Sequence, residues 1–132
     1  DAEIGNASLQ YAFLDLVNEA RAAEGHAPLT WVESDAAEEL TLQRCYELVS
    51  DFSHNRPKGS FAGEVCDSGA TSAQQSFNSW MNSPAHKRIL MSDTYSYMTA
   101  ARAQNYWVIC VWRDSGIERV ERFAPNNYDA YN

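Results

Sequence analysis

The feature that most constrains the fold is a pair of apolar and aromatic runs between Tyr97 and Trp112, interrupted by Gln104 and Asn105. Two short apolar runs joined by two polar residues are typical of an antiparallel β-hairpin. Alternate side chains of a strand point to opposite faces of a sheet. One face would carry Tyr106, Val108, Cys110 and Trp112, and the other Trp107, Ile109 and Val111. Both faces are apolar, which predicts a central strand covered by helices on each side.

Three other segments have the spacing of such helices. Apolar residues at steps of three and four predict a helix from Leu9 to Ala23, which Gly25 ends. A second helix is predicted to begin after Ser34 or Asp35 and to run to about Ser50. Its apolar positions are expected to be buried, and its charged positions are expected to be largely solvated, namely Glu38, Glu39, Arg44 and Glu47.

The stretch WMNSPAHKRIL, residues 80–90, predicts the end of a third helix and the start of a fourth. The third helix would begin after Thr71 or Ser72 and break at Asn82. Ser83 can cap the new helix, and a proline at the next position needs no N–H donor there. His86 would then lie in the first turn, where the helix dipole favours a neutral imidazole that can bind a metal or accept a proton.

The remaining segments predict loops and short strands. Leu29 to Val32 has the pattern of a short extended piece, and residues 51–63 lose all periodicity and form a loop that contains His54. Gly63 to Cys66 is compatible with a strand. Residues 114–132 are predicted to be a C-terminal extension, partly ordered by Val120 and Phe123, after a core of about residues 9–112.

Length and charge narrow the classes of function. With 132 residues, 45% of them hydrophobic, the chain is expected to form a single domain, and we expect a monomer. A formal charge of -8 repels phosphate backbones and anionic headgroups, which excludes nucleic acid as a partner. No apolar run is long enough to form a transmembrane segment. The chain begins at Asp1, so we expect that any leader has been removed, which is compatible with export.

Three polar residues could form a common site, namely His54 in the loop, Glu64 on the short strand and His86 in the helix turn. Two imidazoles and a carboxylate can ligate zinc with one position open to water, or serve as a base and its orienting partner. They lie 10 and 22 positions apart, so spacing alone does not bring them together. The alternative is that His54 and His86 are ordinary surface or hydrogen-bonded histidines. His26, in a helix-terminating turn with no partner nearby in the sequence, is expected to be solvated.

The three cysteines allow one internal bridge and leave one thiol free. None has the C-x-x-C spacing of a zinc or redox motif, which favours a structural role. Cys66 could be a nucleophile near His54, but a buried thiol or half of a disulfide is the simpler interpretation. Since Cys66 and Cys110 are both assigned to strands of one sheet, we expect them to pair, with Cys45 free.

Taken together, several motifs resemble the bacterial branch of the CAP superfamily, which groups cysteine-rich secretory proteins, antigen 5 and pathogenesis-related 1 proteins. They are LVNEAR (16–21), a Pro-Leu turn at 28–29, FSHNRP (52–57), GEV (63–65), WMNSPAHKRIL (80–90) and YWVICVW (106–112). The resemblance implies an α+β fold, an α-β-α sandwich with a small antiparallel sheet between helices. It also implies a surface cleft where paired histidines and acidic residues can hold a divalent metal.

The same resemblance assigns roles to residues in this chain. His54 matches the loop histidine of the family, Glu64 the glutamate of its G-E-N segment, and His86 the histidine of the bacterial W-x-x-S-P-x-H element. Two positions depart from the pattern, because Val65 replaces the usual asparagine and Ser83 stands where the eukaryotic branch has a second glutamate. A four-residue metal site is therefore not expected, whereas a set of His54, Glu64 and His86 remains.

Two functions follow from this resemblance. The first is a secreted or cell-surface domain whose cleft of His54, Glu64 and His86 binds a ligand without catalysis. It requires no cofactor, but the cleft could also hold a divalent metal such as Zn. The ligand classes are a small hydrophobic molecule, a cell-wall component or a host protein. The second is a zinc-dependent hydrolase or protease, in which His54 and His86 hold zinc and Glu64 is a ligand or general base. We favour the first, because no nucleophile elbow or second carboxylate is evident.

Overall fold

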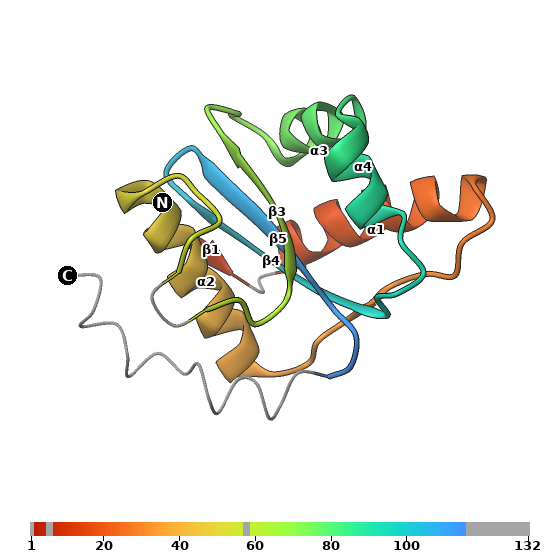
Figure 1. Ribbon diagram of the computed structural model, residues 1–132, viewed down its shortest axis with the longest axis horizontal. Coiled ribbons are helices and arrows are strands. Elements are labelled where there is room, and N and C mark those ends of the chain that lie inside the picture. The colour runs from red at the N-terminus through yellow and green to blue at the C-terminus, as the bar shows by residue number, and fades with distance from the viewer. Residues whose placement is uncertain (1, 5–6, 57–58, 116–132) are drawn as a thin grey trace.

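The computed structural model describes residues 2–4, 7–56 and 59–115. Five strands and four helices appear in these residues (Figure 1). In chain order they are β1 (Ala2–Ile4), α1 (Ala7–Ala23), β2 (Thr30–Trp31), α2 (Asp35–Ser50), β3 (Gly63–Ser68), α3 (Ala73–Met81), α4 (Pro84–Leu90), β4 (Tyr97–Ala103) and β5 (Tyr106–Trp112).

The predicted hairpin is confirmed as β4 and β5, which pair antiparallel from Tyr97 opposite Trp112 to Ala103 opposite Tyr106. The turn between them contains Gln104, whose φ of 57° gives it a left-handed conformation. The sheet order is β1-β4-β5-β3, so β5 lies in the interior and β3 lies at an edge. The short strand expected around Glu64 therefore forms one border of the sheet.

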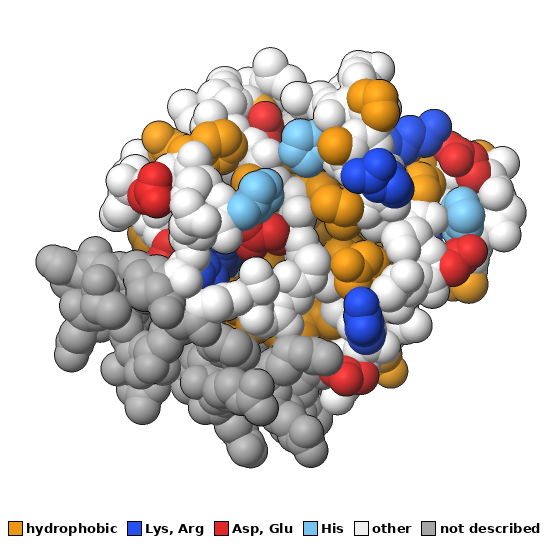
Figure 2. All heavy atoms as spheres, in the orientation of Figure 1, with side chains coloured by type: hydrophobic (Ala, Val, Ile, Leu, Met, Phe, Trp, Pro, Cys, Tyr) orange, Lys and Arg blue, Asp and Glu red, His pale blue; other side chains and the backbone are white. Residues whose placement is uncertain are grey.

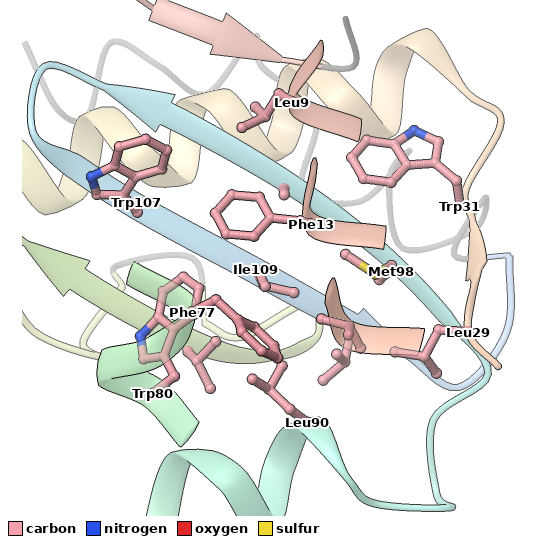
Figure 3. Packing of buried hydrophobic residues seen from close by; sticks show 14 of the residues in the cluster. Leu9, Phe13, Leu29, Trp31, Phe77, Trp80, Leu90, Met98, Trp107 and Ile109 are labelled. Atoms are coloured by element: carbon pink, nitrogen blue, oxygen red, sulfur yellow. The ribbon is translucent and has the colours of Figure 1, made fainter. Parts of the chain in front are cut away.

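The two faces of β5 divide as the alternation predicts. Trp107, Ile109 and Val111 belong to one buried cluster. Val108, Cys110 and Trp112 belong to a second buried cluster on the opposite face. In the first cluster Phe13 contacts two indoles, with ring-centroid distances of 5.8 Å to Trp80 and 5.9 Å to Trp107 (Figure 3). The sheet is therefore covered by apolar side chains on both faces.

Helices lie on both sides of this sheet, which confirms the predicted α+β sandwich. Figure 1 shows α2 on one side and α1, α3 and α4 on the other. The sheet is mixed rather than wholly antiparallel, because β2 pairs parallel to β4, with Thr30 opposite Tyr97. The short extended piece expected from Leu29 to Val32 contains β2, whereas no sequence pattern predicts β1, since a strand of three residues is too short to show alternation.

The helix boundaries follow the predicted caps, with one exception. Ser34 caps α2 by accepting a hydrogen bond from the N–H of Ala37 at 3.2 Å, and Ser72 caps α3 through Gln75 at 3.1 Å. Ser83 occupies the cap position of α4, but its hydroxyl makes no capping bond. That hydroxyl lies 2.9 Å from His86 Nδ1 instead, because residues three apart in a helix turn are neighbours.

The prediction that the charged side chains of α2 are largely solvated is wrong for two of them. Arg44 and Glu47 are buried, with 0% and 4% of their side chains exposed. They lie on the inner face of α2 with Ala37, Leu40 and Leu48. A buried charge requires a partner, and the partners of Arg44 belong to the candidate site.

Other predictions concern the ends and turns of the chain. His26 is not a free turn histidine, because its Nδ1 lies 2.9 Å from Asp93 Oδ1. The proposed extension, 114–132, lies almost wholly outside the described residues, and Val120 and Phe123 are among those not described. Among the described helices, none is long and apolar enough to cross a bilayer.

Candidate functional site

A cavity of about 360 Å³ opens at the sheet edge formed by β3. Its lining comes from three parts of the chain, namely the loop after α2, the C-terminal half of β3 and the first turn of α4. The residues are Phe52, Ser53, His54, Cys66, Asp67, Ser68 and His86. Figure 2 shows two of the three histidine side chains close together on this face. The fold therefore brings His54 and His86 to one cavity although they are far apart in the sequence.

Glu64 lies beneath this cavity in a network of buried charges. The carboxylate accepts two hydrogen bonds from Arg44, from Nε to Oε1 at 2.7 Å and from Nη2 to Oε2 at 2.8 Å. Arg44 also donates from Nη2 to the carbonyl oxygen of Ser53 at 2.6 Å. Arg44, which extends from α2, thus holds β3 through a bidentate contact with Glu64 and holds the loop before His54 through the carbonyl oxygen of Ser53.

Glu47 extends the network toward the other end of the loop. Arg44 Nη1 lies 3.3 Å from Glu47 Oε1, and Arg56 donates from Nε and Nη2 to both oxygens of Glu47 at 2.7 and 3.0 Å. The Arg56 guanidinium also lies 5.0 Å from the ring centroid of Phe61. Two arginines and two glutamates therefore balance each other and hold the loop against α2.

The charged state of Glu64 follows from these contacts. Burial alone would raise the pKa of Glu64, but the hydrogen bonds and charge of Arg44, together with His54, lower it below the usual value. Burial likewise would lower the pKa of Arg44, and its bonds to Glu64 raise it instead. Glu64 is thus an ionised hydrogen-bond acceptor at neutral pH and a poor proton acceptor.

This ionised carboxylate orients His54. His54 Nδ1 lies 2.7 Å from Glu64 Oε2, and because an ionised carboxylate can only accept, Nδ1 must carry the proton. The other ring nitrogen, Nε2, is then available as a ligand or acceptor when the ring is neutral. The His54 side chain is 67% exposed, so this nitrogen is accessible to solvent and to small molecules.

His86 approaches the same cavity from α4. Its Nδ1 lies 2.9 Å from the hydroxyl of Ser83. The wall that carries it is fixed by the preceding helix, because Trp80 is buried and donates from Nε1 to the carbonyl oxygen of Cys66 at 3.0 Å. Both candidate histidines therefore use Nδ1 for a protein contact, and each has its second nitrogen as the remaining donor or acceptor.

The predicted bridge between Cys66 and Cys110 is not formed, and all three cysteines are free and buried. In the sheet register Cys110 is opposite Glu64, whereas Cys66 is opposite Val108. Cys66 and Cys110 are therefore diagonal neighbours, whose Cα atoms in a sheet are typically about 7–8 Å apart, beyond the separation of about 7 Å that a disulfide can span. Burial raises the pKa of Cys66 and Cys110, and that of Cys45 to about 12.

Cys66 lies at the candidate site near His54, a position that was considered in the sequence although a purely structural role was the simpler interpretation. It lines the cavity and lies 3.5 Å from Glu64 Oε2. One ligand atom each of His54, Glu64 and Cys66 lies within 4.8 Å of the other two. His86 is not part of this group, although it lines the same cavity.

Arg44 is the main residue of the site that the sequence analysis did not identify, because its charge led to the prediction that it is solvated. Its position was nevertheless readable, because 37, 41, 44 and 48 follow the steps of four and three that define the inner stripe of a helix. A second cavity, of about 310 Å³, lies at the N-terminal end of β3 and is lined by residues that include Phe61, Gly63 and Trp112. The residues that line it include Arg113 but no histidine, aspartate or glutamate, whereas both candidate histidines and Asp67 line the first cavity.

Solved structures with the same fold come from three bacteria. An extracellular protein containing an SCP domain from Bacillus anthracis has a TM-score of 0.71 at 17% identity, over 81% of this chain and 41% of that protein. An outer surface protein from Borrelia burgdorferi has a TM-score of 0.66 at 16% identity, over 86% of this chain and 100% of that one. A cysteine-rich secretory protein from Staphylococcus aureus has a TM-score of 0.65 at 18% identity, over 83% and 40%.

Two of these proteins are much longer than the present chain, which spans about two fifths of their length. At such low identity the likeness concerns the fold alone. No curated protein matches the sequence. The family model of the cysteine-rich secretory proteins matches residues 14–112, a segment that runs from α1 to the last residue of β5 and contains every residue of the candidate site. The chain therefore belongs to the CAP family, the cysteine-rich secretory protein family.

Proposed function

We propose that this CAP domain is an exported binding module whose β3 cleft takes up a small ligand and releases it unchanged. The observation that carries the proposal is the cavity of about 360 Å³ with two imidazoles on its walls. Small-molecule sites have volumes of about 300–1,000 Å³, so this cleft suits a small molecule or one end of a larger one.

The walls of the cleft favour a ligand with both apolar and polar parts. Phe52 lines the cleft and is 50% exposed, and its ring contacts Tyr106 at a centroid distance of 6.1 Å, so the exposed half of its surface is what a ligand can contact. Asp67 and Ser68 add hydrogen-bonding groups on β3, and the two histidines can donate or accept. A lipid with a polar headgroup and a cell-wall fragment both have this character, and we place a cell-wall component or small hydrophobic ligand ahead of a host protein.

Export is supported by the locations of the structurally similar proteins. The Bacillus anthracis protein is described as extracellular, and the Borrelia burgdorferi protein as an outer surface protein. Their likeness to this chain concerns the fold, so a secreted or cell-surface location for this protein is part of the proposal.

A zinc hydrolase using the same residues is disfavoured by the state of Glu64. The carboxylate accepts from Arg44 through both oxygens and from His54, which lowers its pKa and opposes its use as a general base. The same guanidinium opposes direct coordination of a cation by Glu64. In a zinc site formed by His54 and His86, Glu64 would instead orient His54 from outside the coordination sphere.

Binding can be tested with a panel of fatty acids, sterols and muropeptide fragments, monitored by calorimetry and by mass spectrometry of the recovered ligand. We expect at least one member to bind and to be recovered intact, and Phe52→Ala to weaken it about tenfold or more. Tyr46→Ala is the matched control, because Tyr46 is an exposed aromatic of α2 that does not line the cleft. The proposal is wrong if no member of the panel binds, or if the recovered ligand is cleaved.

A further inference from the structure

The second cavity, at the N-terminal end of β3, lies where three strand ends meet. Strand β5 runs antiparallel to both β3 and β4, so it ends where each of them begins. Arg113, which follows β5, therefore lies close to residues that precede the other two strands, namely Ser60 before β3 and Tyr95 before β4. All three line this cavity of about 310 Å³. The fold thus gathers three polar side chains around one space.

These three side chains are available to a ligand. Within the part of the chain that the structure describes, no hydrogen bond or ion pair engages the guanidinium of Arg113 or the hydroxyls of Tyr95 and Ser60. Arg113 and Ser60 are exposed and Tyr95 is partly buried, so solvent reaches the cavity. A guanidinium and two hydroxyls that line the same space offer several donors to one anionic group.

Gly63 provides the room in which the Tyr95 hydroxyl lies. A Cβ atom at residue 63 would lie 2.8 Å from Tyr95 Oη and 2.9 Å from Val111 Cγ2, closer than side chains approach one another. The end of the Tyr95 ring therefore rests directly on the backbone of β3. Because the strand supports it there, the hydroxyl is held at the cavity and not against a neighbouring side chain.

The rest of the lining is apolar. Phe61 and Trp112 are 4% and 1% exposed, and their ring centroids lie 5.3 Å apart. The indole N–H of Trp112 donates to Thr99 Oγ1 at 3.0 Å, so the ring offers the cavity its carbon surface and not its donor. The cavity therefore combines an aromatic wall with one cation and two hydroxyls.

We propose that this cavity binds a small organic monocarboxylate that carries an apolar body. The planar guanidinium of Arg113 matches a carboxylate with two parallel N–H donors, and the hydroxyls of Tyr95 and Ser60 can donate to the same group. The apolar body lies against Phe61 and Trp112. The volume is at the lower end of the range of small-molecule sites, about 300–1,000 Å³, which limits the size of the acid.

The charge of the lining selects one negative charge. Arg113 is the only charged residue among the described residues that line the cavity, so a single anionic group is matched by a single cation. A dianion would carry an uncompensated charge on a chain whose formal charge is already -8. The inference goes beyond the proposed function, because none of the described residues lines both this cavity and the β3 cleft.

The test is a titration of the isotope-labelled protein with phenylacetate at neutral pH, monitored by nuclear magnetic resonance. We expect saturable shifts at one site, largest at the backbone amides of residues 60–63 and 111–113. Arg113→Gln should raise the Kd about fivefold or more, and Tyr95→Phe, which keeps the ring, about threefold or more. The matched control is Arg88→Gln, because Arg88 is an exposed arginine of α4 that lines neither cavity. Phenylacetamide, which has the same shape without the charge, should bind about fivefold more weakly or worse.

Several outcomes would overturn the assignment. These are a wild-type protein without saturable shifts, an Arg113→Gln variant that binds as tightly as Arg88→Gln, or an amide that binds as tightly as the acid. If Tyr95→Phe is poorly folded by circular dichroism, the exposed substitution Arg113→Gln decides the question. Loss of phenylacetate binding in Phe52→Ala but not in Arg113→Gln would place the acid in the β3 cleft, which refutes this inference and leaves the proposed function intact. Phenylacetate binding that depends on Arg113, in a protein that binds no lipid or muropeptide, would do the opposite.

Discussion

Replacing Arg44 with methionine is the sharpest test of the charge network beneath the cleft. Methionine keeps much of the apolar stem and removes the guanidinium, so the change isolates the charge and its hydrogen bonds. Arg44 donates twice to Glu64 and once to the carbonyl oxygen of Ser53, at 2.6–2.8 Å. After the substitution Glu64 remains 84% covered with no cation bound to it, because its side chain is 16% exposed.

The size of the effect follows from the burial of the pair. Removing one partner of a buried ion pair typically costs about 3–5 kcal/mol, because the remaining charge is desolvated without compensation. Glu47 retains its two bonds from Arg56, so the cost falls mainly on Glu64. For a chain of this length a loss of that size corresponds to a decrease of roughly 10–20 °C in melting temperature.

Chemical unfolding monitored by circular dichroism measures the free energy directly. Adding Glu64→Gln to Arg44→Met removes the stranded charge and should recover about 1–3 kcal/mol relative to Arg44→Met alone. Lys87→Met is the matched control, because its partner Glu24 is 3.0 Å away but both side chains are more than 40% exposed. That control should change stability by less than about 1 kcal/mol. A loss below about 1 kcal/mol in Arg44→Met would refute the reasoning.

Three further predictions concern the same region. The pKa of Glu64 is lowered in the folded state, so its contribution to stability is present above the ordinary carboxyl value of about 4.3 and is lost as pH falls through the lowered folded value. The difference in unfolding free energy between wild type and Arg44→Met should therefore be largest at pH 7 and become smaller in acid. A difference that does not change with pH would contradict this. Gly63→Ala should destabilise the protein by about 1–3 kcal/mol in denaturant titrations, because the new Cβ would lie 2.8 Å from Tyr95 Oη and 2.9 Å from Val111 Cγ2. Alkylation of the unfolded, unreduced chain should modify all three cysteines by mass, since all are free, whereas modification of only one would establish a bridge.

The fold was accessible from the sequence where the pattern is long and periodic. Seven residues of alternating packing in β5 were enough to divide Val108 and Ile109 between the correct faces. The helices were likewise indicated by apolar stripes and capping serines such as Ser34. Strand β1 was missed, and β2 was expected only as a short extended piece, because the pairing of both strands with β4 is a long-range contact that leaves no local periodicity.

The site was only partly accessible for a related reason. His54 and His86 could be named as candidates by residue type and resemblance, but their approach to one cavity depends on the loop after α2 and the first turn of α4 both reaching β3. Arg44 was predicted to be exposed because its charge was given more weight than its position on the inner face of the helix. A charged residue can occupy such a position when it has a buried bidentate partner, as Arg44 has in Glu64.

The location of the cleft follows from the position of β3 at the edge of the sheet. An exposed edge strand presents unpaired backbone groups, which proteins commonly cover with a helix or loop. Here Trp80 donates to the carbonyl oxygen of Cys66 from one side, and the loop carrying His54 covers β3 from the other. A hollow lies between these two covers, and it is lined by three consecutive residues of β3, Cys66 to Ser68, together with one imidazole from each cover. The same arrangement that protects the sheet edge therefore creates the cleft, and Arg44 stabilises it by binding the loop to the strand.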